Sequence, residues 1–259
     1  MATFLFEDII FGPVKSRRLG VSLGINLLPV NKKICTFDCI YCECGFNDEN
    51  KGIKTVMPKA ETVLSELKKV FIDMTNKNTA PDVITYAGNG EPTIHPDFEL
   101  IIDGTIQLRN QYFPKARIAV LSNGTLIHKP SVFNALNKID DNILKLDSGL
   151  EKSIQILDQP AGNFTLDMLV DGLLKFKGNL IIQTMFVKGT YNNINVDNTT
   201  DEDISTWLEL IKKIAPKMVM IYTIERDTPV DRLEKVALED LQSIAAKVED
   251  LGISTQVSG

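Results

Sequence analysis

Four cysteines lie within ten residues near the start of the chain, and the rest of the chain contains none. Cys35, Cys39 and Cys42 follow a C-x3-C-x2-C spacing, with Tyr41 directly before the third cysteine and Cys44 two residues after it. Cysteines this close together do not staple distant segments, and in a cytosolic chain such a group more often binds metal. Because thiolates are the ligands of iron–sulfur clusters, this short loop can hold three corners of a cubane and leave the fourth iron open to a co-substrate.

The same cysteines allow a second interpretation. A C-x3-C-x2-C-x-C run can supply four sulfurs to one tetrahedral zinc ion, or it can close a cluster that only transfers electrons. Such a protein would bind metal without being an enzyme. Structural zinc sites more often use two separated cysteine pairs, so the spacing favours the open iron–sulfur site.

Polar residues also follow three of the predicted strands. A glycine-rich segment, Gly88 to Glu91, comes directly after one of them, and glycines there let the backbone approach a ligand closely because no Cβ stands in the way. Ser122 and Asn123 end the next strand, and Lys145 and Asp147 end the one after it. Since side chains alternate along a strand, Lys145 and Asp147 share a face and form either part of a binding site or a core ion pair.

Short β-branched runs alternate with amphipathic helical segments, which is the pattern of βα units on a parallel sheet. We predict an α/β fold, specifically a partial (β/α)6 TIM-like barrel formed by a single domain over residues 1–259. Periodicity alone also allows a closed eight-stranded barrel or a doubly wound sheet, and in all of these folds the chemistry lies at the carboxyl ends of the strands. The polar stretches 47–54 and 191–203 are predicted to be loops. The predicted strands are Ser22–Leu28, Asp82–Ala87, Arg117–Ser122, Ile143–Asp147, Leu180–Val187, Met218–Thr223 and Ile253–Val257.

The composition is that of an ordinary globular protein, because 44% of the 259 residues are apolar and 24% are charged. No stretch approaches the ~18 apolar residues of a membrane span, and the N-terminus lacks the features of a signal peptide, so we expect a cytoplasmic protein without a membrane partner. A net charge of −6 disfavours sequence-blind binding to nucleic acid. Lys15, Arg17, Arg18 and Arg226 either bind a phosphate or carboxylate of a substrate or form surface ion pairs.

The cysteine loop, with its aromatic residue before the third cysteine, resembles that of the radical S-adenosylmethionine (SAM) superfamily. The segment Gly88 to Glu91 is similar to the glycine-rich motif of that superfamily, which ends in Glu. Within the superfamily, the chain resembles the wyosine-synthase-like proteins, and the resemblance covers most of its length. The segments that carry this closer resemblance are 12–20, 23–26, 184–189 and 222–226.

The resemblance implies an oxidoreductase-like enzyme in which a [4Fe–4S] cluster cleaves SAM reductively to a 5′-deoxyadenosyl radical that abstracts hydrogen from a substrate. It also implies an electron donor such as flavodoxin or ferredoxin. The substrate stays open among RNA, a peptide, the glycyl site of another enzyme and a small metabolite. The implied cluster ligands are Cys35, Cys39 and Cys42. The implied SAM-binding residues are Tyr41, Gly88, Asn89, Gly90, Glu91, Ser122, Asn123 and Asp147.

Overall fold

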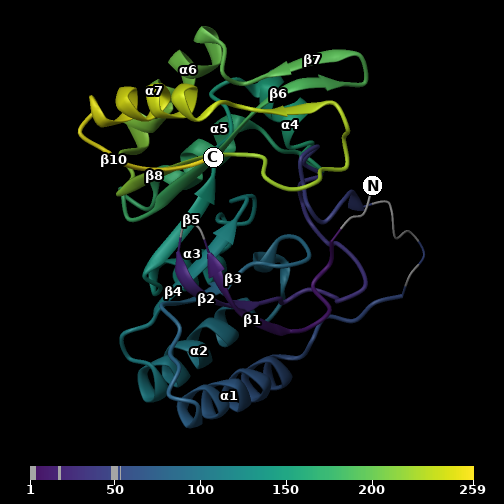
Figure 1. Ribbon diagram of the computed structural model, residues 1–259, viewed down its shortest axis with the longest axis vertical. Helices are drawn as coiled ribbons and strands as arrows, with labels where there is room; N and C mark the ends of the chain where they lie inside the picture. The colour runs from purple at the N-terminus through teal and green to yellow at the C-terminus, as the bar shows by residue number, and fades with distance from the viewer. Residues whose placement is uncertain (1–3, 17–18, 48–51, 53) are drawn as a thin grey trace.

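The computed structural model describes residues 4–16, 19–47, 52 and 54–259. Strands of these residues form one sheet in the order β1-β2-β3-β4-β5-β6-β8-β10, in which all neighbours are parallel except β1, which pairs antiparallel with β2. The sheet curls into an open barrel (Figure 1), so the predicted partial barrel is confirmed, while the single domain over 1–259 stays a prediction. The bounds along this path are β1 Ile10–Ser16, β2 Gly20–Ile25, β3 Val83–Tyr86, β4 Arg117–Ser122, β5 Asp141–Lys145, β6 Ile181–Tyr191, β8 Met218–Thr223 and β10 Ser254–Ser258.

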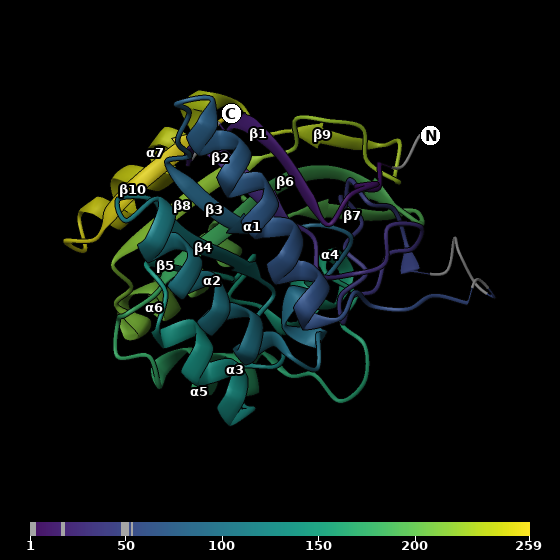
Figure 2. The ribbon, with the colours of Figure 1, turned by 90° about the horizontal axis from the view of Figure 1, so that it is seen from below.

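Helices follow the strands and cover the outer face of the sheet. α1 and α2 lie at one end of the curled sheet and α6 and α7 at the other (Figure 1), and Figure 2 shows α1, α2, α3 and α5 on one side of it. The predicted amphipathic character is seen on α6, where Ile204, Trp207, Ile211 and Ile214 are buried. The helices are α1 Ala60–Asn76, α2 Phe98–Tyr112, α3 Pro130–Asn137, α4 Glu151–Leu157, α5 Leu166–Leu174, α6 Asp201–Ile214 and α7 Leu238–Glu249, with a short 3-10 turn η2 at Pro92–Ile94.

Alternation along the strands divides the apolar residues between two faces of the sheet. Ile84, Val120 and Leu144 belong to the large core beneath the helices. Their neighbours Val83 and Ile143 belong to a smaller apolar cluster on the opposite, inner face of the sheet. This inner cluster fills the barrel near the amino ends of the strands, so space for ligands is left toward their carboxyl ends.

The polar stretch 191–203 is not a loop, and that prediction was wrong. β6 continues to Tyr191 and pairs antiparallel with β7, Ile194–Asp197, and α6 begins at Asp201. Asn192 and Asn193 form the turn between the two strands with φ values of 49° and 63°. A two-residue turn with both φ values positive is the tight hairpin turn that asparagine tolerates, so the Asn-Asn pair was a usable sequence signal.

Two smaller features complete the fold. A short strand β9, Leu233–Lys235, also pairs with β6 on its extended part. Most of the stretch 47–54 lies outside the described residues, so its predicted loop stays a prediction. None of the helices in the described part of the chain combines the length and the apolar composition that a bilayer crossing requires.

Candidate active site

The cysteine loop is held to the barrel by the glycine-rich segment that follows β3. Ile34, directly before Cys35, forms a parallel bridge with Gly90. The Ile34 amide donates to the Asn89 carbonyl at 2.9 Å, and the Glu91 amide donates to the Ile34 carbonyl at 3.0 Å. The glycine-rich motif therefore positions the start of the cysteine loop directly.

A second segment, residues 157–161 after α4, holds the other side of the same loop. The Asp38 amide donates to the Asp158 carbonyl at 2.8 Å, and the Ile40 amide donates to the Leu157 carbonyl at 2.9 Å. Because the loop is hydrogen-bonded on both sides, its cysteines have fixed positions despite the absence of regular structure in it. No local sequence signal marks segment 157–161, since it is about 120 residues away along the chain and contacts the loop mainly through its backbone.

One buried lysine faces the cysteines. Lys33 is 1% exposed, and its Nζ donates to the Asp38 carboxylate at 3.0 Å and to the Gly45 carbonyl at 2.7 Å. Burial alone would lower the pKa of Lys33, but the negative charges of the first three cysteines as thiolates, together with Asp38, raise that pKa above its ordinary value. Lys33 was missed in the sequence because lysines are almost always exposed.

We expect Lys33→Met to shift the midpoint potential of a cluster in this loop to a more negative value, because reduction adds negative charge that a nearby buried cation stabilises. Potentiometric titration followed by electron paramagnetic resonance measures the shift. Lys32→Met, at the neighbouring and less buried lysine, is the matched control. Equal potentials in the two variants would contradict this electrostatic role for Lys33.

The first cysteine is surrounded by amide donors. Cys35 Sγ lies 3.4 Å from the Phe37 amide and 3.6 Å from Asn123 Nδ2. Burial and the nearby Glu91 carboxylate raise the pKa of the Cys35 thiol to about 12. Metal binding displaces the proton of such a thiol, and the amide donors then stabilise the resulting thiolate.

The second and third cysteines differ in their surroundings. Cys39 is buried, its Sγ donates to Asp158 Oδ1 at 3.2 Å, and burial raises the pKa of this thiol. A hydrogen bond from Cys44 lowers the pKa of Cys42 to about 6, and the Lys33 ammonium also lowers it, although burial opposes both. Cys42 is therefore the readiest of the three to become a thiolate ligand.

Glu91 joins the ends of β3 and β4. Its side chain is buried, with Oε1 accepting from Ser122 Oγ at 2.8 Å and from the Thr93 amide at 3.1 Å, and with Oε2 accepting from the Asn123 amide at 2.7 Å. Burial raises the pKa of Glu91, while these hydrogen bonds partly offset the increase. The side-chain amide of Asn123 also donates, from Nδ2 to Thr36 Oγ1 at 2.8 Å. The structure thus brings Glu91, Ser122 and Asn123 together beside Cys35, as expected for one site.

The Asn89 side chain is directed at the N-terminal segment, and a contact of this residue with SAM stays a prediction. Its side-chain amide donates to the carbonyls of Phe6 and Pro29 at 3.0 and 2.9 Å and accepts from the Phe6 amide at 2.8 Å. Asn89 therefore fixes the N-terminal segment to the barrel. Gly88 lies beside it, and its carbonyl accepts from Cys44 Sγ at 3.5 Å.

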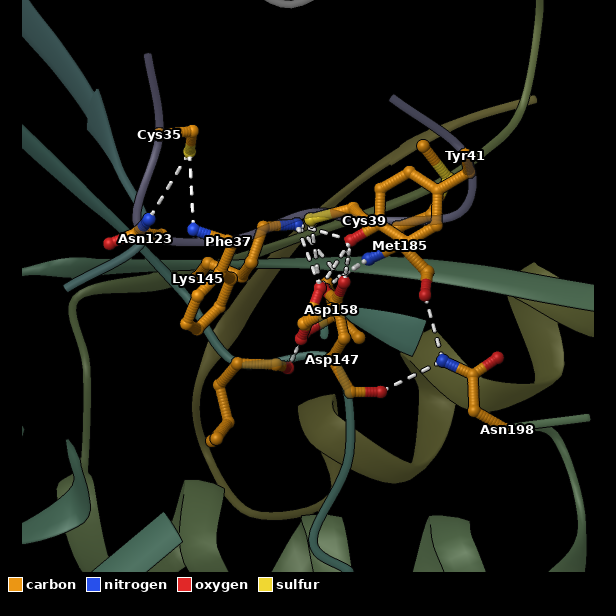
Figure 3. Close-up of polar contacts among 12 residues, drawn as sticks. Cys35, Phe37, Cys39, Tyr41, Asn123, Lys145, Asp147, Asp158, Met185 and Asn198 are labelled. Atoms are coloured by element: carbon orange, nitrogen blue, oxygen red, sulfur yellow. Dashed lines mark hydrogen bonds and ion pairs between the residues drawn. The ribbon is translucent and has the colours of Figure 1, made fainter. Parts of the chain in front are cut away.

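Tyr41 and Asp147 meet in a buried charged group (Figure 3). The Tyr41 hydroxyl donates to Asp147, and Lys145 Nζ donates both to this hydroxyl and to Asp147 Oδ2, the latter at 3.0 Å. Asp158 Oδ1 lies 2.9 Å from the Tyr41 hydroxyl and 3.9 Å from Lys145 Nζ. Burial and the neighbouring Asp147 raise the pKa of Asp158 to about 7, although Lys145 opposes this shift. Lys145 and Asp147 therefore form a buried ion pair at the edge of the site, directly below the cysteine loop.

We expect Lys145→Met to destabilise the protein by about 3 kcal/mol or more, because removing one partner leaves the buried Asp147 carboxylate without its cation. Urea unfolding followed by circular dichroism measures the change. The matched control is Lys152→Met, which removes a lysine whose ion pair with Glu202 is 64% exposed on both sides. The control should leave the unfolding midpoint unchanged. A similar small change in both variants would show that the Lys145 charge is not needed in the fold.

Of the four cationic residues predicted to bind a substrate or to form surface ion pairs, the structure describes Lys15 and Arg226. Arg226 Nη1 lies 2.7 Å from Glu43 Oε2, which sits between Cys42 and Cys44 in the cysteine loop. Lys15 is exposed on β1. Arg17 and Arg18 lie outside the described residues.

The residues fit an iron–sulfur cluster and an additional ligand beside it. Three thiols on one loop are a soft donor set, and each iron of a cubane takes only one of them. In the described part of the chain, no three His, Cys, Asp or Glu side chains converge as ligands of a single metal ion. Asp158 Oδ2 is buried beside Cys39 and Tyr41 and has no hydrogen-bond partner among the described residues. A buried unpaired carboxylate oxygen next to the thiols is consistent with a polar ligand completing the site.

Comparison with known proteins identifies the class. Residues 33–211 match the model of the radical SAM superfamily, so the chain belongs to this superfamily. A UPF0026 protein of Helicobacter pylori is 30% identical over 250 residues, which cover 95% of this chain and 75% of the relative. A Brachyspira hyodysenteriae protein named GTPase Obg is 30% identical over 237 residues, and the match covers 90% of this chain but spans only 32% of that relative.

Solved structures support the same fold. A radical SAM methyltransferase from Sphaerobacter thermophilus superimposes with a TM-score of 0.65 at 11% identity, covering 92% of this chain and 65% of that one. At this identity the likeness concerns the fold alone. The narrower resemblance to wyosine-synthase-like proteins stays a prediction.

Proposed function

We propose that the chain holds a [4Fe–4S] cluster through Cys35, Cys39 and Cys42 and uses it to cleave SAM reductively. The observation that carries this proposal is the cysteine loop itself. It is fixed on both sides, by Gly90 and by segment 157–161, and its three thiols lie close enough to the buried Lys33 ammonium to raise the pKa of Lys33. Membership of the radical SAM superfamily supports the same conclusion.

The loop residues have separate tasks in this proposal. The three thiolates bind the cluster, Lys33 balances part of the negative charge that they bring, and the Asn123 amide donates toward Cys35 Sγ. The loop is packed in an apolar cluster with Phe37, Ile40, Leu157, Met185 and Val187 in its interior. This packing excludes water from one side of the loop, which protects a radical formed there from side reactions.

The SAM-binding residues are proposed on the carboxyl ends of β3, β4 and β5. Glu91 Oε2 accepts one hydrogen bond, from the backbone N–H of Asn123, and can accept a further one from the SAM ammonium. Ser122 keeps the Glu91 carboxylate oriented. The Gly88 and Gly90 backbone is proposed to contact the ligand, although the space of a Cβ at these glycines is taken by Asn26 and Ile34. Tyr41 and Asp147 act at the opposite side of the loop, where Lys145 offers a cation to the SAM carboxylate.

When bound, the cluster supplies one electron to SAM, which splits into methionine and a 5′-deoxyadenosyl radical able to take hydrogen from a substrate. An electron donor such as flavodoxin or ferredoxin, in a cytoplasmic setting, is part of the proposal. The chain itself supplies position, charge balance and shielding from water.

Anaerobic reconstitution with iron and sulfide tests this function. The protein should become brown, and with dithionite and SAM it should release 5′-deoxyadenosine, detected by liquid chromatography and mass spectrometry. Protein omitted from the mixture, and SAM replaced by S-adenosylhomocysteine, are the controls. A colourless protein that retains zinc and forms no 5′-deoxyadenosine would instead support a closed four-cysteine site without catalysis.

A further inference from the structure

A cavity of about 640 Å³ adjoins the proposed cofactor site. Ser22, Thr85 and Leu121 line it from the inner face of β2, β3 and β4. Glu43 of the cysteine loop and Ala87, directly before the glycine-rich motif, line it as well. The cavity therefore reaches from the interior of the curled sheet to the proposed cofactor site, and its volume lies within the ~300–1,000 Å³ of typical ligand pockets.

Two hydroxyl groups form a pair on this inner face. Ser22 Oγ and Thr85 Oγ1 lie 2.8 Å apart on neighbouring parallel strands, and the two residues are 5% and 6% exposed. One hydrogen bond between two hydroxyls uses only one of their two protons. Neither hydroxyl has a further hydrogen-bond partner among the residues that the structure describes. The pair therefore keeps one proton to donate and several lone pairs that can accept.

The unused proton and lone pairs define the kind of group that the hydroxyl pair can bind. Buried polar groups nearly always have hydrogen-bond partners, and both hydroxyl residues line the cavity. A hydroxyl or a carboxamide both donates and accepts hydrogen bonds, so either group can satisfy the pair. A ketone, an ester or a carboxylate only accepts, and an alkyl group does neither. The pair therefore favours an uncharged group that has both a donor and an acceptor.

Apolar side chains stand next to the hydroxyl pair. Ser22 and Gly24 are two residues apart and therefore face the same side of β2. Phe11 covers Gly24, where an added Cβ would come within 2.1 Å of its ring, and Phe6 stacks on Phe11 with ring centroids 3.8 Å apart. Both rings line the cavity, as does Leu121 on β4. Ligand pockets combine such an apolar lining with a few polar groups, so an apolar ligand body beside the bound polar group fits this cavity.

The strand geometry gives the distance from the hydroxyl pair to the proposed cofactor site. Thr85 and Ala87 are two residues apart, and both line the cavity. Two residues of a parallel strand span ~7 Å, which is about five bonds of an extended carbon chain. Ala87 directly precedes Gly88, where the proposed SAM contacts begin. A ligand bound at Thr85 therefore presents to the cofactor a carbon that is about five bonds away from its polar group.

We propose that Ser22 and Thr85 select the substrate, which is a small molecule with an apolar body and a hydroxyl or carboxamide group at one end. The inference rests on the proposed function, because it names the substrate class of that same cofactor site. At the carbon beside Ala87 a C–H bond breaks, and its hydrogen atom passes to the 5′-deoxyadenosyl radical to give 5′-deoxyadenosine. The unpaired electron stays on the substrate. Ser22 and Thr85 do not touch the reacting carbon, and they determine which molecule is held there.

The test uses the reconstituted protein with SAM and two uncharged probes of the same shape. Hexanamide has both a donor and an acceptor in its polar group, whereas heptan-2-one has a methyl group in place of the amide NH2 and only accepts. Titrations followed by saturation-transfer NMR give the affinity of each probe. The unchanged protein is compared with two double variants, each of which lacks one buried pair of hydroxyls.

The double variant Ser22→Ala with Thr85→Val should fold, because replacing both partners of a buried hydrogen bond by apolar groups is nearly neutral for stability. It should bind hexanamide about 30-fold more weakly, equivalent to ~2 kcal/mol for two lost hydrogen bonds. It should bind heptan-2-one only about fivefold more weakly, equivalent to ~1 kcal/mol. The matched control, Tyr86→Phe with Thr105→Val, removes a buried hydroxyl pair between β3 and α2 on the outer face of the sheet and should leave both affinities unchanged.

Three results would overturn this inference while leaving the proposed function intact, provided that the protein still forms 5′-deoxyadenosine. They are equal losses of affinity for the two probes, equal affinities of the two double variants, and an absence of hexanamide binding. If the double variant at Ser22 and Thr85 is unstable, each single variant should still lose more affinity for hexanamide than for heptan-2-one. Hexanamide binding that depends on the hydroxyl pair, in protein that forms no 5′-deoxyadenosine, would contradict the proposed function and keep the pair as a binding site.

Discussion

We expect Cys39→Ala to abolish retention of the cluster and Cys44→Ala to leave the iron content close to that of the unchanged protein. Cys39 lies between Cys35 and Cys42 in the loop, is 7% exposed, and its Sγ donates to Asp158 Oδ1, 3.2 Å away. Cys44 Sγ is hydrogen-bonded to Cys42 and also donates to the Gly88 carbonyl, 3.5 Å away. The structure therefore assigns the two thiols different environments, even though they are only five residues apart.

Iron and sulfide content per chain, together with the visible absorption of the cluster, measures this difference. Both variants replace a cysteine of the same loop by the same small residue. Equal iron loss in the two variants would mean that Cys44 is a fourth ligand. The site would then be closed, and the proposed binding of SAM to an open iron would be wrong.

The strands of the barrel could be predicted from the sequence because each of them depends on a local pattern of residues. All seven predicted strands occur, and Arg117–Ser122 and Met218–Thr223 have the predicted bounds. The sequence of a buried parallel strand is a short run rich in β-branched residues. Such a run can be recognised without knowing the rest of the fold. The hairpin at β7 was missed because this strand has only four residues, two of them polar, and only Val196 among them is buried.

The candidate site was predictable where its residues follow the ends of strands. Glu91, Ser122 and Asn123 come together because neighbouring parallel strands end at the same edge of the sheet. Lys33 and Asp158 could not be found in this way. Their positions depend on how an irregular loop packs against a segment more than 100 residues away, and neither position has a composition or a period that reveals it.

Asn89 shows what a motif leaves open. Its place within the glycine-rich motif predicts a ligand contact, which stays a prediction, and its side-chain amide is bound to the Phe6 and Pro29 backbone. A motif identifies which backbone approaches a site, but the direction of each side chain depends on the tertiary contacts around it. The motif thus serves here first as the support of the cysteine loop.

Gly90→Ala should remove most of the cluster from the reconstituted protein, because Gly90 is the point where that support contacts the loop. A Cβ at this position would lie 1.9 Å from the Ile34 carbonyl oxygen. The position of each of these atoms is fixed by the backbone, so no side-chain rotation can relieve the clash. Gly90 also has a φ of +130°, which residues with a side chain rarely adopt. The loop would have to move away from β3, which would break the bridge between Ile34 and Gly90. Cys35, the next residue after Ile34, would be displaced with it.

Gly162→Ala separates the two possible causes of iron loss in Gly90→Ala, which are the clash of the added Cβ with Ile34 and the backbone strain at a positive φ. Gly162 also has a positive φ, +73°, but an added Cβ there meets no atom within 4 Å, so the substitution costs backbone strain of only ~1–2 kcal/mol. Iron content and urea unfolding of both variants give the comparison. We expect Gly162→Ala to lose some stability and keep its iron, and Gly90→Ala to lose iron even in conditions where it remains folded. If the two variants retain equal iron, the contact between the glycine-rich motif and Ile34 does not position the cysteines, and the motif must act on the bound ligand alone.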